Sequence, residues 1–312
     1  MFRSLASVHQ TRDDAYRRED GGMLKYWKPV VDAAAEHLPF AWAAVSAYLH
    51  EADGKGITIT EACPEPHAYL RRDWELWEEL PRVGRKSAPK NDLEKKLQDA
   101  HLRVEVWSNS NTKTVMVAFG GTASLKDMGA NARWFLPFGA PDAYVALTEV
   151  FMPAFIGAYK TRAKRPDGAW LNTARVVSTG HSLGGGLAQR FVYSLDPAAG
   201  VPSVKDVYAF NPSPVSGKRG APFPTQAEGL TIYRIYNRGE VLAGVRSILQ
   251  WGNPGNARNE GQTWVDMRYS SDWSWRALLP DGWIRAHGMR ELACFMKNYQ
   301  EGDGIVRKTK SE

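Results

Sequence analysis

The sequence Gly-His-Ser-Leu-Gly at residues 180–184 constrains the fold of this chain more than any other segment. It follows a β-rich run at residues 174–179 and precedes a helix-forming run at residues 187–193. A serine on a tight turn from strand to helix needs glycines two residues before and after it, because a Cβ there would collide with the neighbouring strand or helix. We interpret the turn as a nucleophile elbow with Ser182 as the nucleophile; a chance occurrence of the pattern is the alternative.

The elbow requires a base, because a serine hydroxyl is a poor nucleophile until its proton is removed. In proteins with this turn, an acid and then a histidine follow the serine along the chain. Only one of the seven histidines, His287, lies downstream of Ser182. We therefore predict that His287 is the general base; a histidine that caps a helix is the alternative.

The acid that orients the base is less restricted, because several carboxylates lie between Ser182 and His287. Glu240 is our choice, since it closely follows the predicted strand at residues 231–236, and the carboxyl ends of strands are where an α/β sheet places its chemistry. Asp266 and Asp272 remain alternative acids. The alternative to a catalytic role for Glu240 is a glutamate in a solvated turn.

An oxyanion hole is expected from two backbone N–H groups. One belongs to Leu183, the residue after the nucleophile, and the other to a loop that follows an earlier strand. Gly120 and Gly121 end such a strand and let the backbone come close to a substrate carbonyl. Thr122 then offers both its N–H and its hydroxyl.

The arrangement of predicted elements indicates an α/β fold. Residues 1–100 are expected to be mostly helical, with helical spacing at residues 23–31, 41–49 and 69–80, and to form an N-terminal extension packed on the core. Pro39 and a proline-containing segment near Cys63 are expected to interrupt these helices. Residues 101–300 begin with a hairpin of strands at 102–107 and 114–119, after which strands and helices alternate. A tryptophan-rich loop after the strand at 231–236 and a last helix from about residue 289 complete this part. This alternation predicts a mostly parallel sheet with helices on both faces, and residues 301–312 form a polar tail.

These motifs together resemble the class 3 lipase family. The resemblance rests on Val-Ala-Phe-Gly-Gly-Thr-Ala-Ser at 117–124 with Asp127 and Asn131, on 178–185, on Ala-Phe-Asn-Pro at 209–212, on 236–241 and on Ala-His-Gly-Met at 286–289, and it runs from about residue 102 to 293. It implies an α/β-hydrolase fold, a serine triad without a cofactor, and hydrolysis of acylglycerols or phospholipids. Ser182, His287, Glu240, Thr122 and Leu183 take the family's site positions. Two departures are Gly120, where an arginine is usual, and Glu240, where an aspartate is usual.

The resemblance also implies a lid after the oxyanion strand. Residues 128–139 carry an apolar edge flanked by glycines, which is consistent with a hinged lid; a core-packed segment is the alternative. A second group of apolar side chains lies near His287 in sequence. We interpret these side chains as part of the core; an acyl channel or a lipid interface is the alternative. The members of this group are Trp251, Trp264, Trp273, Trp275 and Trp283.

Composition excludes several other classes of protein. The net charge of +6 is modest, and no nucleic-acid-binding motif accompanies the basic segments, so no nucleic-acid partner is expected. No apolar run is long enough for a membrane span, and the N-terminal residues lack a secretory signal, which predicts a cytoplasmic protein, with signal-independent export as the alternative. Cys63 and Cys294 are expected to be free thiols, although one long-range disulfide is also possible, and neither has metal-ligand spacing.

The sequence therefore favours a cofactor-independent serine esterase or lipase, whose substrate is a lipid ester and whose surface contacts a lipid interface. An acyltransferase that uses the same acyl-enzyme is the first alternative. The second is a non-catalytic hydrolase-like module that binds a lipid or a protein, but a strained elbow has no use in such a module.

Overall fold

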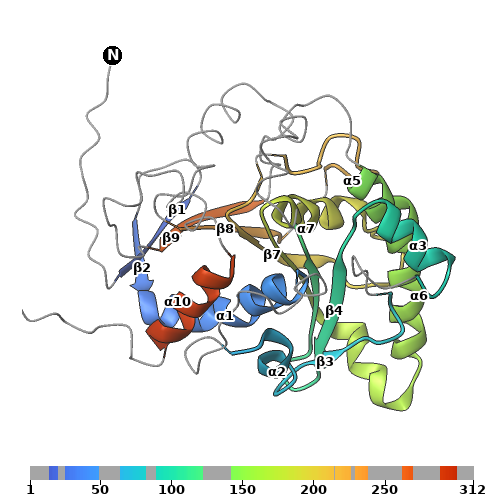
Figure 1. Ribbon diagram of the computed structural model, residues 1–312, viewed down its shortest axis with the longest axis horizontal. Coiled ribbons are helices and arrows are strands. Elements are labelled where there is room, and N and C mark those ends of the chain that lie inside the picture. Colours follow the sequence, from blue (N-terminus) through green and yellow to red (C-terminus); the bar gives the residue numbers. More distant parts are fainter. Residues whose placement is uncertain are drawn as a thin grey trace, which may run out of the picture.

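The computed structural model describes residues 14–19, 25–48, 64–81, 89–121, 142–213, 215–225, 229–237, 262–269 and 289–300. The described strands form one sheet in the order β2-β1-β9-β8-β7-β6-β5-β4-β3 (Figure 1). Their bounds are β1 Asp14–Glu19, β2 Lys25–Pro29, β3 Glu75–Leu76, β4 Val104–Asn109, β5 Thr114–Phe119, β6 Arg175–His181, β7 Val204–Phe210, β8 Thr231–Asn237 and β9 Thr263–Tyr269.

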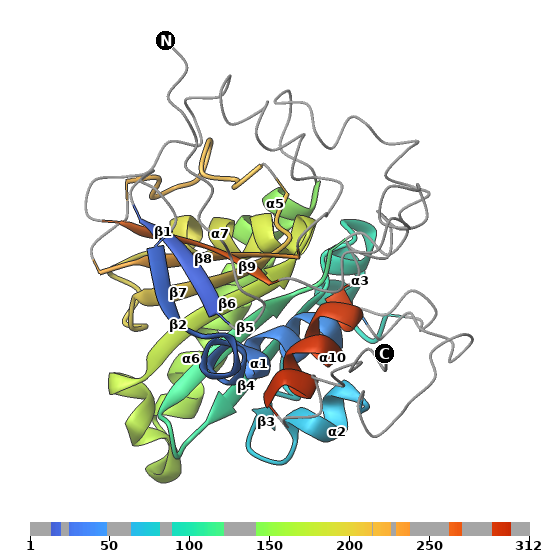
Figure 2. The same ribbon diagram turned by 90° about the vertical axis from the view of Figure 1, so that its left-hand side faces the viewer.

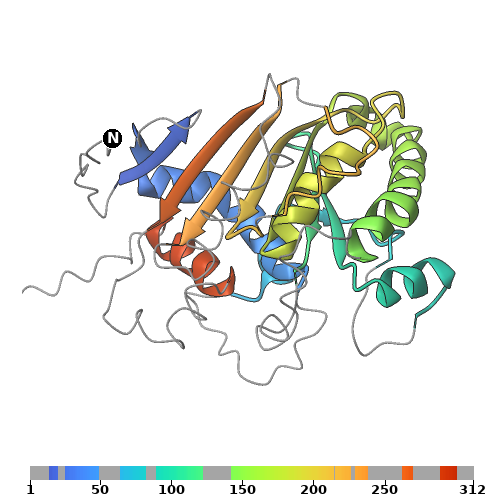
Figure 3. The same ribbon diagram turned by 90° about the horizontal axis from the view of Figure 1, so that it is seen from above.

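The centre of the sheet is parallel. Strands β5 to β9 run in the same direction, whereas β1, β2, β3 and β4 pair in antiparallel fashion at the two edges. The carboxyl ends of the five parallel strands therefore lie together on one side of the sheet, which we call its carboxyl edge (Figure 3). This arrangement confirms the expected α/β class of fold with a mostly parallel central sheet.

Helices cover both faces of the sheet. Helices α1, α2 and α10 lie on one face, and α3, α5, α6 and α7 lie on the other (Figures 1 and 2). Their bounds are α1 Val30–Ser46, α2 Pro66–Leu70, α3 Asp92–Asp99, α5 Asp142–Ala146, α6 Met152–Ala163, α7 Leu183–Ser194 and α10 Met289–Gln300, with a π-turn at Leu147–Phe151 and a 3₁₀ segment at Pro166–Thr173. None of the described helices combines the length and apolarity that crossing a membrane requires.

Strand alternation produces two separate hydrophobic cores, because successive side chains point to opposite faces. On the α7 face, Phe119, Phe151, Phe155 and Phe191 pack ring against ring, with centroids 5.3–6.4 Å apart. On the α1 face, the Tyr208 ring stacks on Phe40 at 3.9 Å. These cores fix the sheet and both helical layers around the carboxyl edge of the central strands.

The N-terminal segment is helical only in part. The helix expected at residues 23–31 is wrong, because residues 25–29 form β2 and only Val30 begins α1. The helix expected at 69–80 is also wrong, because α2 ends at Leu70 and β3 pairs with β4. Both segments contain an edge strand: β2 pairs with β1, which directly precedes it along the chain, whereas β3 pairs with β4, which is distant in sequence.

Two further elements differ from the sequence-based expectation. Helix α1 continues through Pro39, which was expected to interrupt it, and all its residues from Ala41 to Ala44 are fully buried. Strand β9 replaces part of the expected tryptophan-rich loop, and it pairs with both β8 and β1. The hairpin of β4 and β5 and helix α7 agree with the prediction, because each is specified by contiguous residues.

A buried carboxylate connects α1 and α2 to the sheet. Glu105 on β4 accepts hydrogen bonds from Ser46 Oγ at 2.5 Å and from Trp107 Nε1 at 3.1 Å. His67 Nε2 lies 2.9 Å from the other oxygen of the same carboxylate. Burial lowers the pKa of His67, but Glu105 and Glu65 raise it by more, so the net pKa of His67 lies above its ordinary value of 6.5.

The cysteines differ from the leading expectation. Cys294, half-buried on α10, is disulfide-bonded. The sequence contains one other cysteine, Cys63, which lies outside the described residues and is the partner by elimination. The expectation of two free thiols is therefore wrong, and the alternative of one long-range disulfide holds. Charge and spacing along the sequence carry no signal for such a pairing.

Replacing His67 with glutamine is expected to change how stability depends on pH. Because the folded pKa of His67 is raised, its stabilisation is complete below about pH 6.5, the unfolded value, and is lost as the pH rises through the folded pKa. The difference in Tm between wild type and His67→Gln should shrink between pH 6 and pH 9. His101→Asn, at an exposed left-handed position, is the control; an equal pH trend in both variants would contradict the role of Glu105.

Reduction of the disulfide is expected to destabilise the protein by about 2–4 kcal/mol, because the reduced chain gains entropy when unfolded. Thiol titration of the denatured, unreduced protein should detect no thiol, and titration after reduction should detect both cysteines. The double variant Cys63→Ala/Cys294→Ala should not respond to the reductant. Two titratable thiols before reduction would refute the disulfide.

Candidate active site

Ser182 occupies a strained turn at the carboxyl end of β6. Its backbone has φ 56° and ψ −120°, a region that residues other than glycine rarely adopt, at a cost of about 1–3 kcal/mol. Three backbone hydrogen bonds hold the turn. Ser182 N–H donates to the Phe210 carbonyl at 3.0 Å, and the Ser182 carbonyl accepts from Gly185 N–H at 3.0 Å and from Ser213 N–H at 2.9 Å. The turn joins the end of β6 directly to the start of α7.

Steric contacts explain both glycines of the elbow. A Cβ on Gly180 would lie 2.2 Å from the Gly184 carbonyl oxygen and 2.9 Å from that of Phe119. A Cβ on Gly184 would lie 2.2 Å from the Phe119 carbonyl oxygen. Since all these atoms are backbone, no side-chain rotation could relieve the clash. This close approach of β5, β6 and α7 is what the sequence pattern predicted.

Helix α7 begins directly at the nucleophile. Leu183 is its first residue, and the first N–H groups of a helix have no partner within the helix. They also carry the positive end of the helix dipole. An oxygen atom bonded to Ser182 that becomes negatively charged would therefore meet donors that are already in place. The role of Leu183 as an oxyanion donor stays a prediction.

The second expected donor, Thr122, lies outside the described residues, and the structure describes the chain up to Gly121. Gly120 continues the β5 pairing, since its N–H donates to the Arg103 carbonyl at 3.1 Å. Arg103 Nη1 donates to the Gly121 carbonyl at 3.2 Å. Arg103 therefore anchors the end of β5 that precedes Thr122. Strand β5 also pairs with β6, so this end lies beside the strand that carries the elbow.

Tyr48 connects the end of α1 to both parts of the site. Its hydroxyl lies 2.9 Å from His181 Nδ1 and donates to the His181 carbonyl at 3.1 Å. A Cβ on Gly121 would lie 2.2 Å from the same hydroxyl oxygen. Tyr48 thus fills the space between the elbow and the end of β5.

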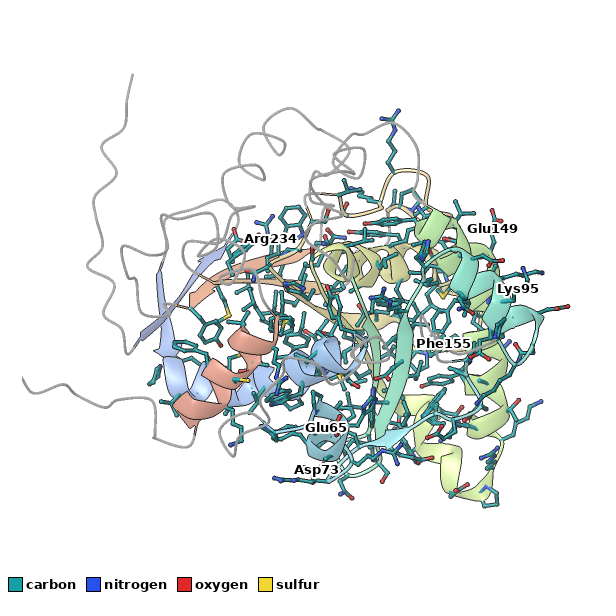
Figure 4. All side chains as sticks on the ribbon, viewed as in Figure 1. Glu65, Asp73, Lys95, Glu149, Phe155 and Arg234 are labelled. Carbon is teal, nitrogen blue, oxygen red and sulfur yellow. The ribbon has the colours of Figure 1, made fainter. Side chains whose placement is uncertain are left out.

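Of the candidate acids, only Asp266 is described, and it is already engaged. Its carboxylate accepts from Arg234 Nε at 2.5 Å and from Nη2 at 2.7 Å. Arg234 projects from β8 away from α1 and α10 (Figure 4) and stacks on Trp264 at 4.3 Å. Asp266 lies within β9 and is paired with Arg234 in the ladder, so it is part of a structural ion pair. Glu240 and Asp272 lie outside the described residues.

His287 also lies outside the described residues. Two residues after it, α10 begins at Met289, which is buried in the same hydrophobic cluster as Phe210 and Met267 at the ends of β7 and β9. Of the predicted site residues, the structure places Ser182 and Leu183. For His287 and Glu240 it places only the neighbouring elements, which are the start of α10 and the end of β8.

The expected lid at residues 128–139 and four of the five tryptophans near His287 lie outside the described residues. Trp264 is described: it is half-buried on β9, packs against the core of the α7 face and lies under Arg234. This placement agrees with core packing for that tryptophan. Within the described part of the chain, no group of three or more histidine, cysteine, aspartate or glutamate side chains could hold a metal ion.

Sequence reasoning missed Tyr48 and Arg103. Neither lies in a recognisable motif, and each reaches the site through contacts with residues more than fifteen positions away in sequence. An aromatic residue at the end of an apolar helix and an arginine at the start of a strand are both ordinary, so no sequence signal marked them.

Comparison with known proteins gives a similarity in structure only. No protein-family model matches the chain, and no curated protein matches its sequence. Its fold is similar to that of fungal lipases. Lipase II from Rhizopus niveus is 14% identical, with a TM-score of 0.48, over 82% of this chain and 93% of its own. Lip2 lipase from Yarrowia lipolytica is 16% identical, with a TM-score of 0.44, over 75% and 78%. The Rhizomucor miehei lipase propeptide complex is 14% identical, with a TM-score of 0.42, over 77% and 71%.

Gly184→Ala is expected to destabilise the protein by about 1–3 kcal/mol or more, because the new Cβ has to push the end of β5 away from α7. Gly157→Ala on α6 is the matched control: nothing lies within 4 Å of its Cβ, so it should stabilise the helix by about 0.5–1 kcal/mol. Chemical denaturation of both variants measures the difference. Two variants of equal stability would contradict the close packing at the elbow.

Proposed function

We propose that this protein is a serine-dependent carboxylic ester hydrolase that acts on lipid esters, acylglycerols or phospholipids. The observation that carries the proposal is the backbone of Ser182. A φ of 56° at a non-glycine residue, between two glycines that admit no Cβ, is costly to maintain, and such a strained turn from strand to helix is typical of a nucleophilic serine.

In the proposed acylation step, His287 removes the proton from Ser182 as the hydroxyl oxygen attacks the ester carbonyl. Glu240 holds the His287 ring and stabilises its charged form. The negative carbonyl oxygen is bound by the N–H groups of Leu183 and Thr122. When the intermediate collapses, His287 passes the proton to the departing alcohol, and an acyl group remains on Ser182.

Deacylation repeats the same proton transfers with water in place of Ser182. His287 takes a proton from the water, the resulting hydroxide attacks the acyl carbonyl, and the ester bond to Ser182 breaks. The proton returns to the Ser182 oxygen, which releases a free carboxylic acid. No metal or cofactor takes part in either step.

Glu240 is favoured as the acid by the pairing of Asp266. A triad acid must accept a hydrogen bond from the histidine, but both Asp266 oxygens already accept from Arg234. Glu240 follows the end of β8, which is two strands from β6 in the sheet. Of the remaining acids, Asp272 follows the more distant β9.

The lipid part of the proposal rests on the resemblance of the motifs around Ser182, Thr122 and His287 to class 3 lipases. An acyl chain needs an apolar surface beside the nucleophile, and residues 128–139 carry such side chains in sequence. We propose that this segment covers the site in water and contacts a lipid interface.

The disulfide of Cys294 supports a proposal about the compartment. Disulfides persist in oxidising environments and are rare in the reducing cytosol. We therefore propose that the protein acts in an oxidising compartment outside the cytosol.

Hydrolysis of p-nitrophenyl esters of short to long acyl chains, together with a phospholipid, tests the proposed function. Ser182→Ala should reduce kcat by about 10⁴-fold or more, and Glu240→Ala by about 10³–10⁴-fold, because each removes a member of the triad. Asp266→Asn is the control; it should lower Tm, because it weakens the pair with Arg234, but leave kcat within about twofold.

Product analysis should detect free acid and alcohol in equal amounts. A Ser182→Ala variant that is as active as wild type would refute the proposed nucleophile. A severe loss of activity in Asp266→Asn, with Glu240→Ala as active as wild type, would instead identify Asp266 as the acid. Acyl transfer to an added alcohol in preference to water would favour the acyltransferase alternative.

A further inference from the structure

Arg103 holds the backbone directly before the proposed oxyanion donor. It lies immediately before β4, its side chain is buried, and its Nη1 donates to the Gly121 carbonyl at 3.2 Å. Hydrogen bonds from a charged donor are stronger than those between neutral groups. This contact therefore fixes the orientation of the peptide bond that joins Gly121 to Thr122.

The orientation of that peptide determines where the Thr122 N–H points. In a trans peptide the C=O and the N–H are directed oppositely, because the group is planar. Strand β5 lies between β4 and β6 in the sheet, with Arg103 at β4 and Ser182 at the end of β6. Because Arg103 Nη1 holds the Gly121 carbonyl, the N–H of the same peptide faces away from the Arg103 guanidinium.

Tyr48 holds the other half of the same site. Its hydroxyl donates to the carbonyl of His181, which is the residue directly before Ser182, and lies 2.9 Å from the His181 ring. The same oxygen lies against Gly121, where a Cβ would approach within 2.2 Å. Tyr48 therefore sets the separation between the end of β5 and the elbow.

We propose that Arg103 and Tyr48 are positioning residues for the oxyanion hole. Arg103 directs the Thr122 N–H toward the reacting carbonyl, and Tyr48 keeps that N–H at the correct distance from the elbow and the Leu183 N–H. The inference rests on the proposed function, and neither side chain touches the substrate. Two N–H groups act together only when their spacing matches one oxygen atom.

Kinetics with Arg103→Met, Arg103→Lys and Tyr48→Phe test this role. The substrate is a p-nitrophenyl ester, and a fluorophosphonate probe reports separately on attack by Ser182. Arg175→Met is the matched control, because Arg175 also forms a hydrogen-bonded ion pair, with Asp206, but at the opposite end of β6. All variants are compared with wild type for Tm, kcat and KM.

Arg103→Met should lower kcat about 10–100-fold, with KM within about twofold, because an oxyanion hole binds the transition state and not the ground state. Tyr48→Phe should lower kcat about tenfold by the same mechanism. Labelling by the fluorophosphonate should slow by similar factors, since its phosphoryl oxygen uses the same donors. Arg103→Lys, which keeps one charged donor, should retain more kcat than Arg103→Met and remain folded.

Three results would overturn the proposal. The first is a kcat for Arg103→Met or Tyr48→Phe within twofold of wild type. The second is an equal loss of kcat in Arg175→Met, which would mean that lost stability is the cause. The third is a loss that falls on KM alone. Failure of the proposed function is distinguishable from these, because the wild-type protein would then neither hydrolyse the ester nor react with the probe.

Discussion

The site depends on one close approach of backbone segments, in which the first turn of α7 lies directly against the end of β5. Gly184 leaves no layer of side chains between the helix and the Phe119 carbonyl. The N-terminus of α7 therefore reaches the carboxyl edge of the sheet, where its N–H groups and its dipole act on whatever is bonded to Ser182. A helix displaced by the width of one methyl group could not deliver the Leu183 N–H to the same place.

The strain at Ser182 is supported by β7 and by the loop that follows it. Ser182 N–H donates a hydrogen bond to the Phe210 carbonyl, and the Ser182 carbonyl accepts one from Ser213 N–H. Arg190 holds the loop that contains Ser213, because it donates to the Gly217 carbonyl at 2.7 Å and to the Gly220 carbonyl at 3.0 Å. Each of these hydrogen bonds contributes about 1 kcal/mol to stability. Together they offset the free-energy cost of the unusual backbone angles at Ser182. The elbow is thus a property of three neighbouring strands rather than of five residues.

The sequence predicted the elements that are held by interactions between neighbouring residues, and it missed those that depend on residues distant in sequence. The elbow, the hairpin of β4 and β5 and helix α7 are specified by neighbouring residues, and the structure agrees with all three. Strand β3 was not predicted, because its partner β4 is distant in sequence and the pairing exists only in the folded sheet. Arg103 and Tyr48 were missed for the same reason: their contacts with Gly121 and His181 exist only after the sheet and α1 have assembled.

Helix α1 links the parts of the site that lie farthest apart in sequence. Its last turn places the Ala47 carbonyl 2.7 Å from where a Cβ on Gly120 would lie, and Tyr48 follows directly. Helix α10 packs along α1, and the disulfide of Cys294 adds a covalent constraint to α10. Since His287 precedes α10 by two residues, the proposed base and the proposed oxyanion loop are supported by the same helix. A shift of α1 would therefore move both relative to Ser182, so the N-terminal segment is part of the site's framework and not a separable extension.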